Sequence, residues 1–244
     1  MPSGAHTRAL TLGITVLLAG LCAAGYREID VPHGGRIVGT VRVAGDVAPL
    51  PPQPVFKEQE TCSATVRDDR LVVDPEGRLE GAVVHLVGVS SGKAIALEPV
   101  LLDNRKCAFV PHVAVATVGQ PLEIRNDDPF LHDAHAIVGD TTLFNLAVPK
   151  GRTVRRVLST PGIVHINCNV RHTWMHAYVF VTDDPYRAVT DGVGHFALDD
   201  VPPGTYTVAV WHELLGSRTR EVTVRPDETA TVDVELDAVA TEKP

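Results

Sequence analysis

The sequence lacks helical periodicity, an excess of basic residues and any apolar run long enough for a membrane helix. Nowhere in the 244 residues do apolar side chains recur at helical spacing over more than a turn or two. The longest apolar run, residues 9–21, is shorter than the roughly 20 residues of a membrane span. The formal charge is −8, with acids and bases interspersed. These absences argue against a helical fold and against nucleic acid as a partner.

The apolar run near the N-terminus has the outline of a secretory signal. His6 and Arg8 precede it and the small residues 22–25 follow it, so we expect cleavage near Ala24 or Gly25. An uncleaved anchor is the alternative. A lipoprotein signal at Cys22 fits poorly, because Leu21 stands where a small residue is expected. A signal at 1–25 predicts a periplasmic or secreted protein with no membrane span after cleavage.

Apolar and polar residues alternate with a period of two in short segments along the rest of the chain. Hydrophobic residues make up 44% of the sequence, enough for a sizeable core. Clusters of Gly, Pro, Asp and Ser separate the segments and predict turns. The pattern predicts an all-β protein of the antiparallel sandwich type, with strands near 37–43, 71–73, 79–87, 99–102, 114–117, 120–125, 134–138, 142–146, 153–158, 162–168 and 175–181.

The stretch from Val164 to Met175 carries the most informative residues. Val164, Ile166 and Cys168 alternate with polar residues, so an extended strand directs the Cys168 thiol toward the core. Residues 169–173 lack alternation and predict a tight loop, after which Met175 begins a second strand. Cys168, His172 and Met175 can therefore converge on one point.

Thiolate, imidazole and thioether form an unusual set of metal donors. Zinc gains little from a thioether, and calcium and magnesium prefer oxygen. Copper accepts all three, and two histidines with a cysteine and a weak axial methionine form the blue-copper site. The second histidine is expected upstream, within residues 126–135, which contain His132 and His135. His135 would face the other side of a regular strand, so it is either a surface residue or a ligand presented by a bulge.

These residues resemble those of a cupredoxin of the plastocyanin and amicyanin type. The resemblance covers roughly residues 105–182 and rests on Phe109-x-Pro111, Val118-Gly119-Gln120, Leu122 to Asn126 with Asp128, His132, and Cys168-x3-His172-x2-Met175. It implies one type 1 copper ion held by His132, Cys168, His172 and Met175. Three residues separate Cys168 from His172, as in cytochrome oxidase subunit II and unlike plastocyanin. Since the binuclear site of that subunit needs a cysteine where this chain has Val164, a single copper is favoured.

A second resemblance involves both flanks of this segment. Residues 190–198 and 201–212, with Gly39-Thr40-Val41 and residues 82–86, resemble the carboxypeptidase regulatory-like, transthyretin-like sandwich. We therefore expect a signal at 1–25, the first part of this sandwich at 26–103, an inserted cupredoxin at 104–183, the rest of the sandwich at 184–236 and a disordered tail at 237–244. Three consecutive β segments are the alternative. The combination also resembles periplasmic proteins of bacterial methylamine utilization.

Three cysteines remain after removal of the signal. In an oxidising compartment two normally pair. Because His172 and Met175 flank Cys168, we expect a disulfide between Cys62 and Cys107 and a metal-binding thiolate at Cys168. The alternative is that Cys168 pairs and one of the others is merely buried.

The resemblance to cupredoxins implies an electron carrier. In addition, no spacing of carboxylates, hydroxyls and histidines indicates a catalytic triad or an acid–base pair. We expect no enzymatic activity and a redox protein, a cytochrome or a dehydrogenase, as partner. His172, on an exposed loop, would be the electron exit. His112 is expected at the surface, although it could be a further ligand. The alternatives are copper delivery or sensing, and a scaffold without redox activity.

Overall fold

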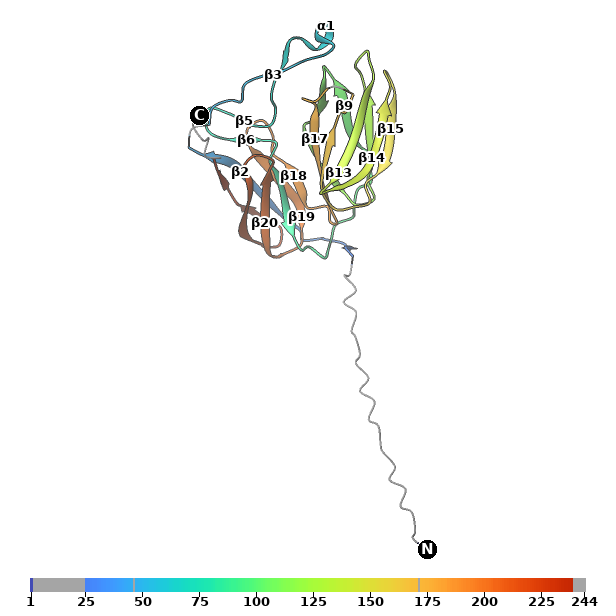
Figure 1. The fold of residues 1–244 in the computed structure, drawn as a ribbon. Coiled ribbons are helices and arrows are strands. Elements are labelled where there is room, and N and C mark those ends of the chain that lie inside the picture. The colour runs from blue at the N-terminus through green and yellow to red at the C-terminus, as the bar shows by residue number, and fades with distance from the viewer. Residues whose placement is uncertain (2–24, 46, 171, 239–244) are drawn as a thin grey trace.

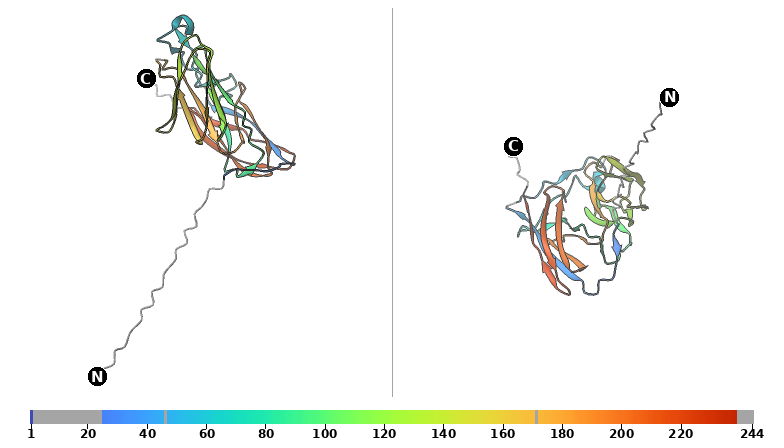
Figure 2. Two further views of the ribbon diagram at one scale, coloured as in Figure 1. Left: turned by 90° about the vertical axis from the view of Figure 1, so that its right-hand side faces the viewer. Right: turned by 90° about the horizontal axis from the view of Figure 1, so that it is seen from below.

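The computed structural model describes Met1 and residues 25–45, 47–170 and 172–238. These residues form two β-sandwiches that lie side by side (Figure 1), and Figure 2 shows the same two bodies from the side and from below. The fold is all-β, as predicted. No helix of the described residues is long and apolar enough to cross a membrane. Residues 2–24 of the predicted signal and 239–244 of the predicted tail lie outside the described residues.

The first sandwich contains the strands from the middle of the chain. One sheet has the order β10-β9-β12-β15, with β9 at Val100–Arg105, β10 at Ala108–Val110, β12 at Pro121–Asn126 and β15 at Thr153–Val157. The other has the order β11-β17-β16-β13-β14, with β11 at Val113–Thr117, β13 at His132–Val138, β14 at Thr141–Val148, β16 at Gly162–Asn167 and β17 at His176–Thr182. In β16 the buried side chains are Val164 and Ile166, so the predicted alternation does set which face of this strand packs inward.

The second sandwich joins the two ends of the chain. One sheet has the order β18-β7-β20-β21, with β7 at Val83–Val87, β18 at Arg187–Val189, β20 at Gly204–His212 and β21 at Gly216–Val224. In the other, β2 at Gly35–Ala44 pairs with β19 at His195–Val201, β22 at Thr229–Thr231 and β23 at Val234–Asp237. Ile37, Leu86, Leu198 and Val208 belong to one core, which strands from both ends of the chain therefore share.

After β7 the chain passes to the strands β9 to β17 of the first sandwich, and it returns to the second with β18. The change of sandwich occurs earlier than the expected boundary at residue 103, because β9 begins at Val100 and pairs with β12 along its length. Leu102 is fully buried in the first core, so burial of its side chain ties this segment to the middle of the chain. At the other end, β23 continues to Asp237.

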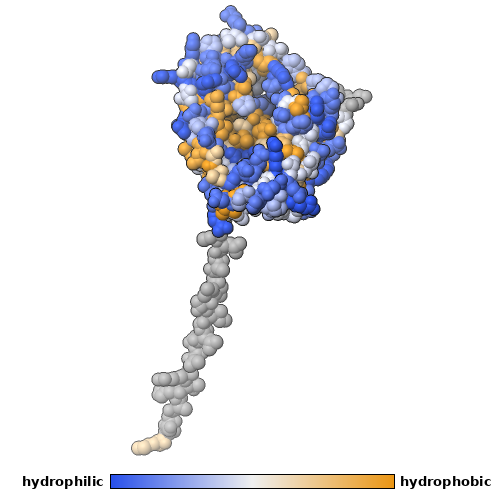
Figure 3. All heavy atoms as spheres, turned by 180° about the vertical axis from the view of Figure 1, so that it is seen from behind, coloured by the Kyte–Doolittle hydropathy of each residue, from blue (hydrophilic) through white to orange (hydrophobic). Residues whose placement is uncertain are grey.

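Strand β17 packs on both faces. Its inward residues, such as Val179, belong to the first core. Its outward residues meet the second sandwich: Tyr178 lies 5.4 Å from Trp211 of β20 between ring centroids, and Phe180 lies 4.9 Å from His85 of β7. The two sandwiches are therefore joined through aromatic side chains. On the rear face, hydrophobic residues gather over the middle of the molecule and hydrophilic ones surround them (Figure 3).

Three short strand pairs and one helical turn complete the described fold. Strand β1 (Arg27–Glu28) pairs with β8 (Ser91–Gly92), β3 (Gln53–Pro54) with β4 (Thr65–Val66), and β5 (Val72–Val73) with β6 (Leu79–Glu80). Helix α1 (Gln59–Cys62) lies between β3 and β4. We call residues 53–66 the cap segment.

The cap segment belongs to the first sandwich, although the sequence placed it with the second. Val55 and Cys62 are buried in the first core, and a disulfide joins Cys62 to Cys107 in the turn between β9 and β10. The expected assignment of all of 26–103 to the regulatory-like sandwich is therefore wrong for this segment. The disulfide itself joins the two cysteines that were expected to pair.

Candidate metal centre

The loop between β16 and β17 holds three of the predicted copper ligands. Cys168 follows β16 directly, and its backbone N–H donates to the carbonyl oxygen of Met175 at 3.2 Å. The N–H of Met175 in turn donates to the carbonyl oxygen of His172 at 2.8 Å. These two hydrogen bonds close the loop on itself, so Cys168, His172 and Met175 lie at one end of the sheet.

The side chains of His132, Cys168 and His172 form a compact triangle. Cys168 Sγ lies 3.6 Å from Nδ1 of each histidine, and the two Nδ1 atoms lie 3.0 Å apart. A point equidistant from these atoms lies about 2.0 Å from each, which matches a metal–nitrogen bond and is slightly short for a metal–sulfur bond. Met175 is buried in the same core as Cys168. The donor set and its spacing fit one copper ion.

Asp128 orients the first of these histidines. Nε2 of His132 lies 3.0 Å from Oδ2 of Asp128, so this nitrogen carries the hydrogen and donates it, while Nδ1 presents its lone pair to the triangle. The Asp128 carboxylate also accepts backbone N–H groups from Lys106 at 2.7 Å and Cys107 at 2.9 Å. Burial alone would raise the pKa of Asp128, but these hydrogen bonds hold it below its ordinary value.

Burial keeps the side chains of Cys168 and His172 uncharged. It raises the pKa of the Cys168 thiol to about 11, against the opposing effect of the backbone amides of Asp133 and Val170. Burial, followed by the proximity of His132, lowers the pKa of His172 to about 4. A cation that binds here must therefore displace the thiol proton, whereas the imidazole of His172 is already free of its second proton at neutral pH.

His172 is not at the surface. It is 1% exposed, and its Nε2 atom has no hydrogen-bond partner among the described residues. The rings of Phe130 and Trp174 lie 5.4 and 5.2 Å from its ring, and the charges of Lys57 and Glu58 in the cap segment act on it. The expectation that His172 is exposed is therefore wrong. No local pattern indicates that the cap segment lies beside this loop.

The two other candidate histidines lie outside the triangle. His135 contacts Thr142 Oγ1 through Nε2 and Asn169 Nδ2 through Nδ1, both at 2.9 Å, so neither of its ring nitrogens faces the thiol. His112 lies against Glu213 of the second sandwich.

Two residues that support the candidate copper ligands were not predicted from the sequence. Asp128 is part of the cupredoxin-like motif and lies four residues before His132, a spacing that could have indicated its hydrogen bond to this histidine. The hydrogen bonds of the Cys107 backbone to Asp128 and Trp174 have no signal in the sequence.

A comparison with protein families supports the second of the two resemblances. A family model for the carboxypeptidase regulatory-like domain matches residues 174–237, which include β17 and all of the second sandwich that follows it. No curated protein is found to match the chain.

Solved structures similar to the chain include copper proteins. A copper-containing nitrite reductase from Thermus scotoductus is 26% identical over 38% of this chain, with a TM-score of 0.33. The chain spans about a quarter (24%) of that protein. A reduced amicyanin variant is 19% identical over 34% of this chain and 81% of its own, and a purple cupredoxin from Nitrosopumilus maritimus is 22% identical over 35% and 99%. Both have a TM-score of 0.31.

Proposed function

We propose that this protein carries single electrons by means of one copper ion, which His132, Cys168, His172 and Met175 would hold. The observation that supports this most directly is the triangle of one sulfur and two imidazole nitrogens within 3.6 Å of one another. Copper, when bound, would supply a couple of two oxidation states that differ by one electron. We propose a carrier and not an enzyme, exported to the periplasm or beyond.

The residues of the chain would keep the donors in place. Hydrogen bonds from Cys168 and Met175 fix the loop, and Asp128 fixes the ring of His132. Donors held in this way need little rearrangement when an electron enters or leaves. Phe130 and Trp174 pack against His172 and exclude water, which also strengthens the electrostatic influence of nearby dipoles on the site.

A redox protein, such as a cytochrome or a dehydrogenase, would be the partner. Because His172 is buried, the partner would have to approach across the surrounding surface. Leu131, next to the ligand His132, is 47% exposed, and Phe56 of the cap segment is 75% exposed. Exposed apolar side chains near a buried redox centre are suited to a transient contact.

The test is to load the purified protein with copper and record its visible absorption, its electron paramagnetic resonance spectrum and its reversible reduction. We expect one equivalent of copper, an intense thiolate-to-copper band and reversible one-electron cycling. Cys168→Ala should abolish the band, and His132→Ala should alter or abolish it. His135→Ala is the matched control, since this histidine lies on the same strand outside the triangle, and it should leave the band unchanged.

The same measurements separate the carrier from the alternatives. A protein that binds copper but cannot be cycled reversibly would favour delivery or sensing, and the absence of stoichiometric copper would favour a scaffold. Burial of all three donors argues against delivery, because an ion that is handed to another protein needs an exposed path. A strong visible band that persists in Cys168→Ala would refute the assignment of the thiolate.

A further inference from the structure

A second group of metal-binding side chains lies where the two sandwiches meet. His112 precedes β11, His176 opens β17 and Glu213 follows β20, so the first two come from one sandwich and the third from the other. One nitrogen or oxygen from each lies within 4.8 Å of the others. Nε2 of His112 contacts Oε1 of Glu213, and Nε2 of His176 lies 3.8 Å from Oε2 of the same carboxylate.

Hydrogen bonds at the far side of each imidazole set which nitrogen faces the carboxylate. Nδ1 of His112 lies 3.2 Å from the carbonyl oxygen of His176, and Nδ1 of His176 lies 3.2 Å from the carbonyl oxygen of Trp174. A carbonyl oxygen only accepts, so both Nδ1 atoms carry hydrogen. In neutral imidazoles both Nε2 lone pairs then point at a carboxylate, which also offers only lone pairs. A cation between them resolves this conflict.

Among the described residues, Glu213 forms ion pairs with histidines and with no lysine or arginine. The side chains of His112, His176 and Glu213 are 16%, 17% and 5% exposed. The guanidinium of Arg70 acts on Glu213, but it is held by both oxygens of Asp68, at 2.8 Å through Nε and 2.5 Å through Nη2. A buried carboxylate that lacks a full counter-charge of its own is costly, and a bound cation would supply that charge.

We propose that His112, His176 and Glu213 form a second metal site, which takes a divalent ion of the zinc class. Two imidazoles and a carboxylate are the donors of three-ligand zinc sites, in which the fourth position is open to water or a substrate. Calcium and magnesium prefer oxygen donors alone. In a tetrahedral site the donors are roughly 3.3 to 3.5 Å apart, which is close to the 3.8 Å between Nε2 of His176 and Oε2 of Glu213.

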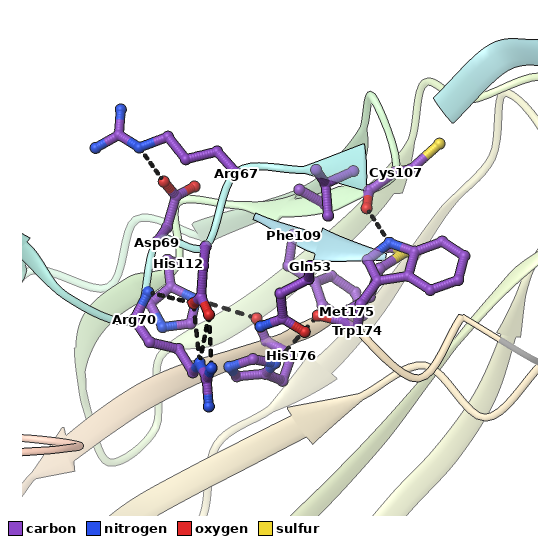
Figure 4. A pocket seen from close by; sticks show the side chains of 13 residues that line it. Gln53, Arg67, Asp69, Arg70, Cys107, Phe109, His112, Trp174, Met175 and His176 are labelled. Carbon is purple, nitrogen blue, oxygen red and sulfur yellow. Dashed lines mark hydrogen bonds and ion pairs between the residues drawn. The ribbon is translucent and has the colours of Figure 1, made fainter. Parts of the chain in front are cut away.

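A small cavity lies beside the two histidines. His112 and His176 line a cavity of about 30 Å³ together with Arg70, Trp174 and Met175 (Figure 4). This volume accommodates a water molecule. The two sites share no ligand, but His176 directly follows Met175 in the chain. A substitution of His176 could therefore disturb both sites, so the test uses Glu213 and His112.

The experiment is a calorimetric titration of the full chain with zinc alone, in a Cys168→Ala background that removes the thiolate of the first centre. We expect one equivalent of zinc, and a loss of affinity of about tenfold or more when Glu213→Gln is added, since this change keeps the shape and removes the charge. Glu221→Gln, an exposed carboxylate on the adjacent strand, is the matched control and should bind zinc like the background.

Two results would overturn the proposal. The first is that the Cys168→Ala variant takes up no zinc. The second is that neither Glu213→Gln nor His112→Gln changes the affinity for zinc. Either result would mean that His112 and Glu213 form only an ion pair. If Glu213→Gln does not fold, His112→Gln decides the matter. X-ray absorption at the zinc edge gives a second readout, with nitrogen and oxygen neighbours and no sulfur expected. Failure of the copper centre to cycle electrons would not affect any of these outcomes.

Discussion

The indole N–H of Trp174 donates to the carbonyl oxygen of Cys107 at 2.9 Å. The backbone N–H of Cys107 donates at 2.9 Å to Asp128, whose carboxylate also accepts the Nε2 hydrogen of His132. Cys107 therefore connects both halves of the candidate copper centre: the loop that carries His172 and the strand that begins with His132. It is also tied to the cap segment through its disulfide with Cys62.

Replacement of Trp174 by Phe should destabilise the protein without copper by about 1–2 kcal/mol beyond the packing loss, because a buried carbonyl group loses its hydrogen bond. Urea unfolding of the metal-free protein measures this. Trp211→Phe is the control, since Trp211 packs against Tyr178 and Phe180 and makes no hydrogen bond to a described residue through its indole N–H. Equal losses in the two variants would show that the Cys107 contact has no special weight.

Removal of the disulfide should cost about 4 kcal/mol in the free energy of unfolding, from the entropy of closing a loop of this length. The bond joins residues 45 positions apart. Cys62→Ala/Cys107→Ala, measured without copper, should match the wild-type protein in reductant. Because the cap segment lies beside His172, we also expect a chelator to extract copper faster from the double variant than from the wild type. Unchanged extraction would mean that the cap segment does not restrict access to the centre.

Part of this arrangement could be predicted from the sequence. The alternation around Val164 and Val179 predicted the strands that flank the ligand loop, because a side chain two residues further on faces the same side whatever the partner strand. The order of His132, Cys168, His172 and Met175 predicted a common site because each donor type narrows the choice of metal. These inferences depend on local spacing and on chemistry, and both can be read from one chain.

The rest depends on contacts between distant segments. Nothing near His172 in the sequence indicates that Lys57 and Glu58 lie close to it, so its burial could not be predicted. The meeting of His112 and Glu213 requires the two sandwiches to be joined through β17, which no local pattern indicates. Packing between domains brings these residues together.

Asp128→Asn should weaken copper binding about 10- to 100-fold, because the charge that fixes the ring of His132 and makes it a better donor is lost. A competition titration with a copper chelator measures the affinity. Asp127→Asn is the neighbouring control, since Asp127 is paired with Arg125 at 3.0 Å at the surface. A comparable loss in the control would mean that charge in general, and not the contact with His132, determines the affinity.

His212 should make stability depend on pH. This residue is buried at the end of β20, and burial lowers the pKa of its imidazole to about 4, with Glu213 opposing and His112 adding to the shift. A histidine with a folded-state pKa below that of the unfolded chain stabilises the fold above pH 6.5, and the contribution is lost as pH falls toward 4. The loss between pH 7 and pH 5 should be about 2 kcal/mol.

The test compares urea unfolding of the wild type and His212→Asn at both pH values, since the amide oxygen can accept the N–H of Leu214 that Nδ1 of His212 now accepts at 3.3 Å. The stability of the wild type alone does not isolate His212, because Asp184 acts in the opposite direction. Burial raises the pKa of Asp184 to about 6, so its protonation stabilises the fold as the pH falls over the same range. The stability difference between the two proteins cancels that effect and should shift toward the variant by about 2 kcal/mol at pH 5. A constant difference between wild type and His212→Asn would show that His212 takes up its proton as readily in the folded protein as in the unfolded chain.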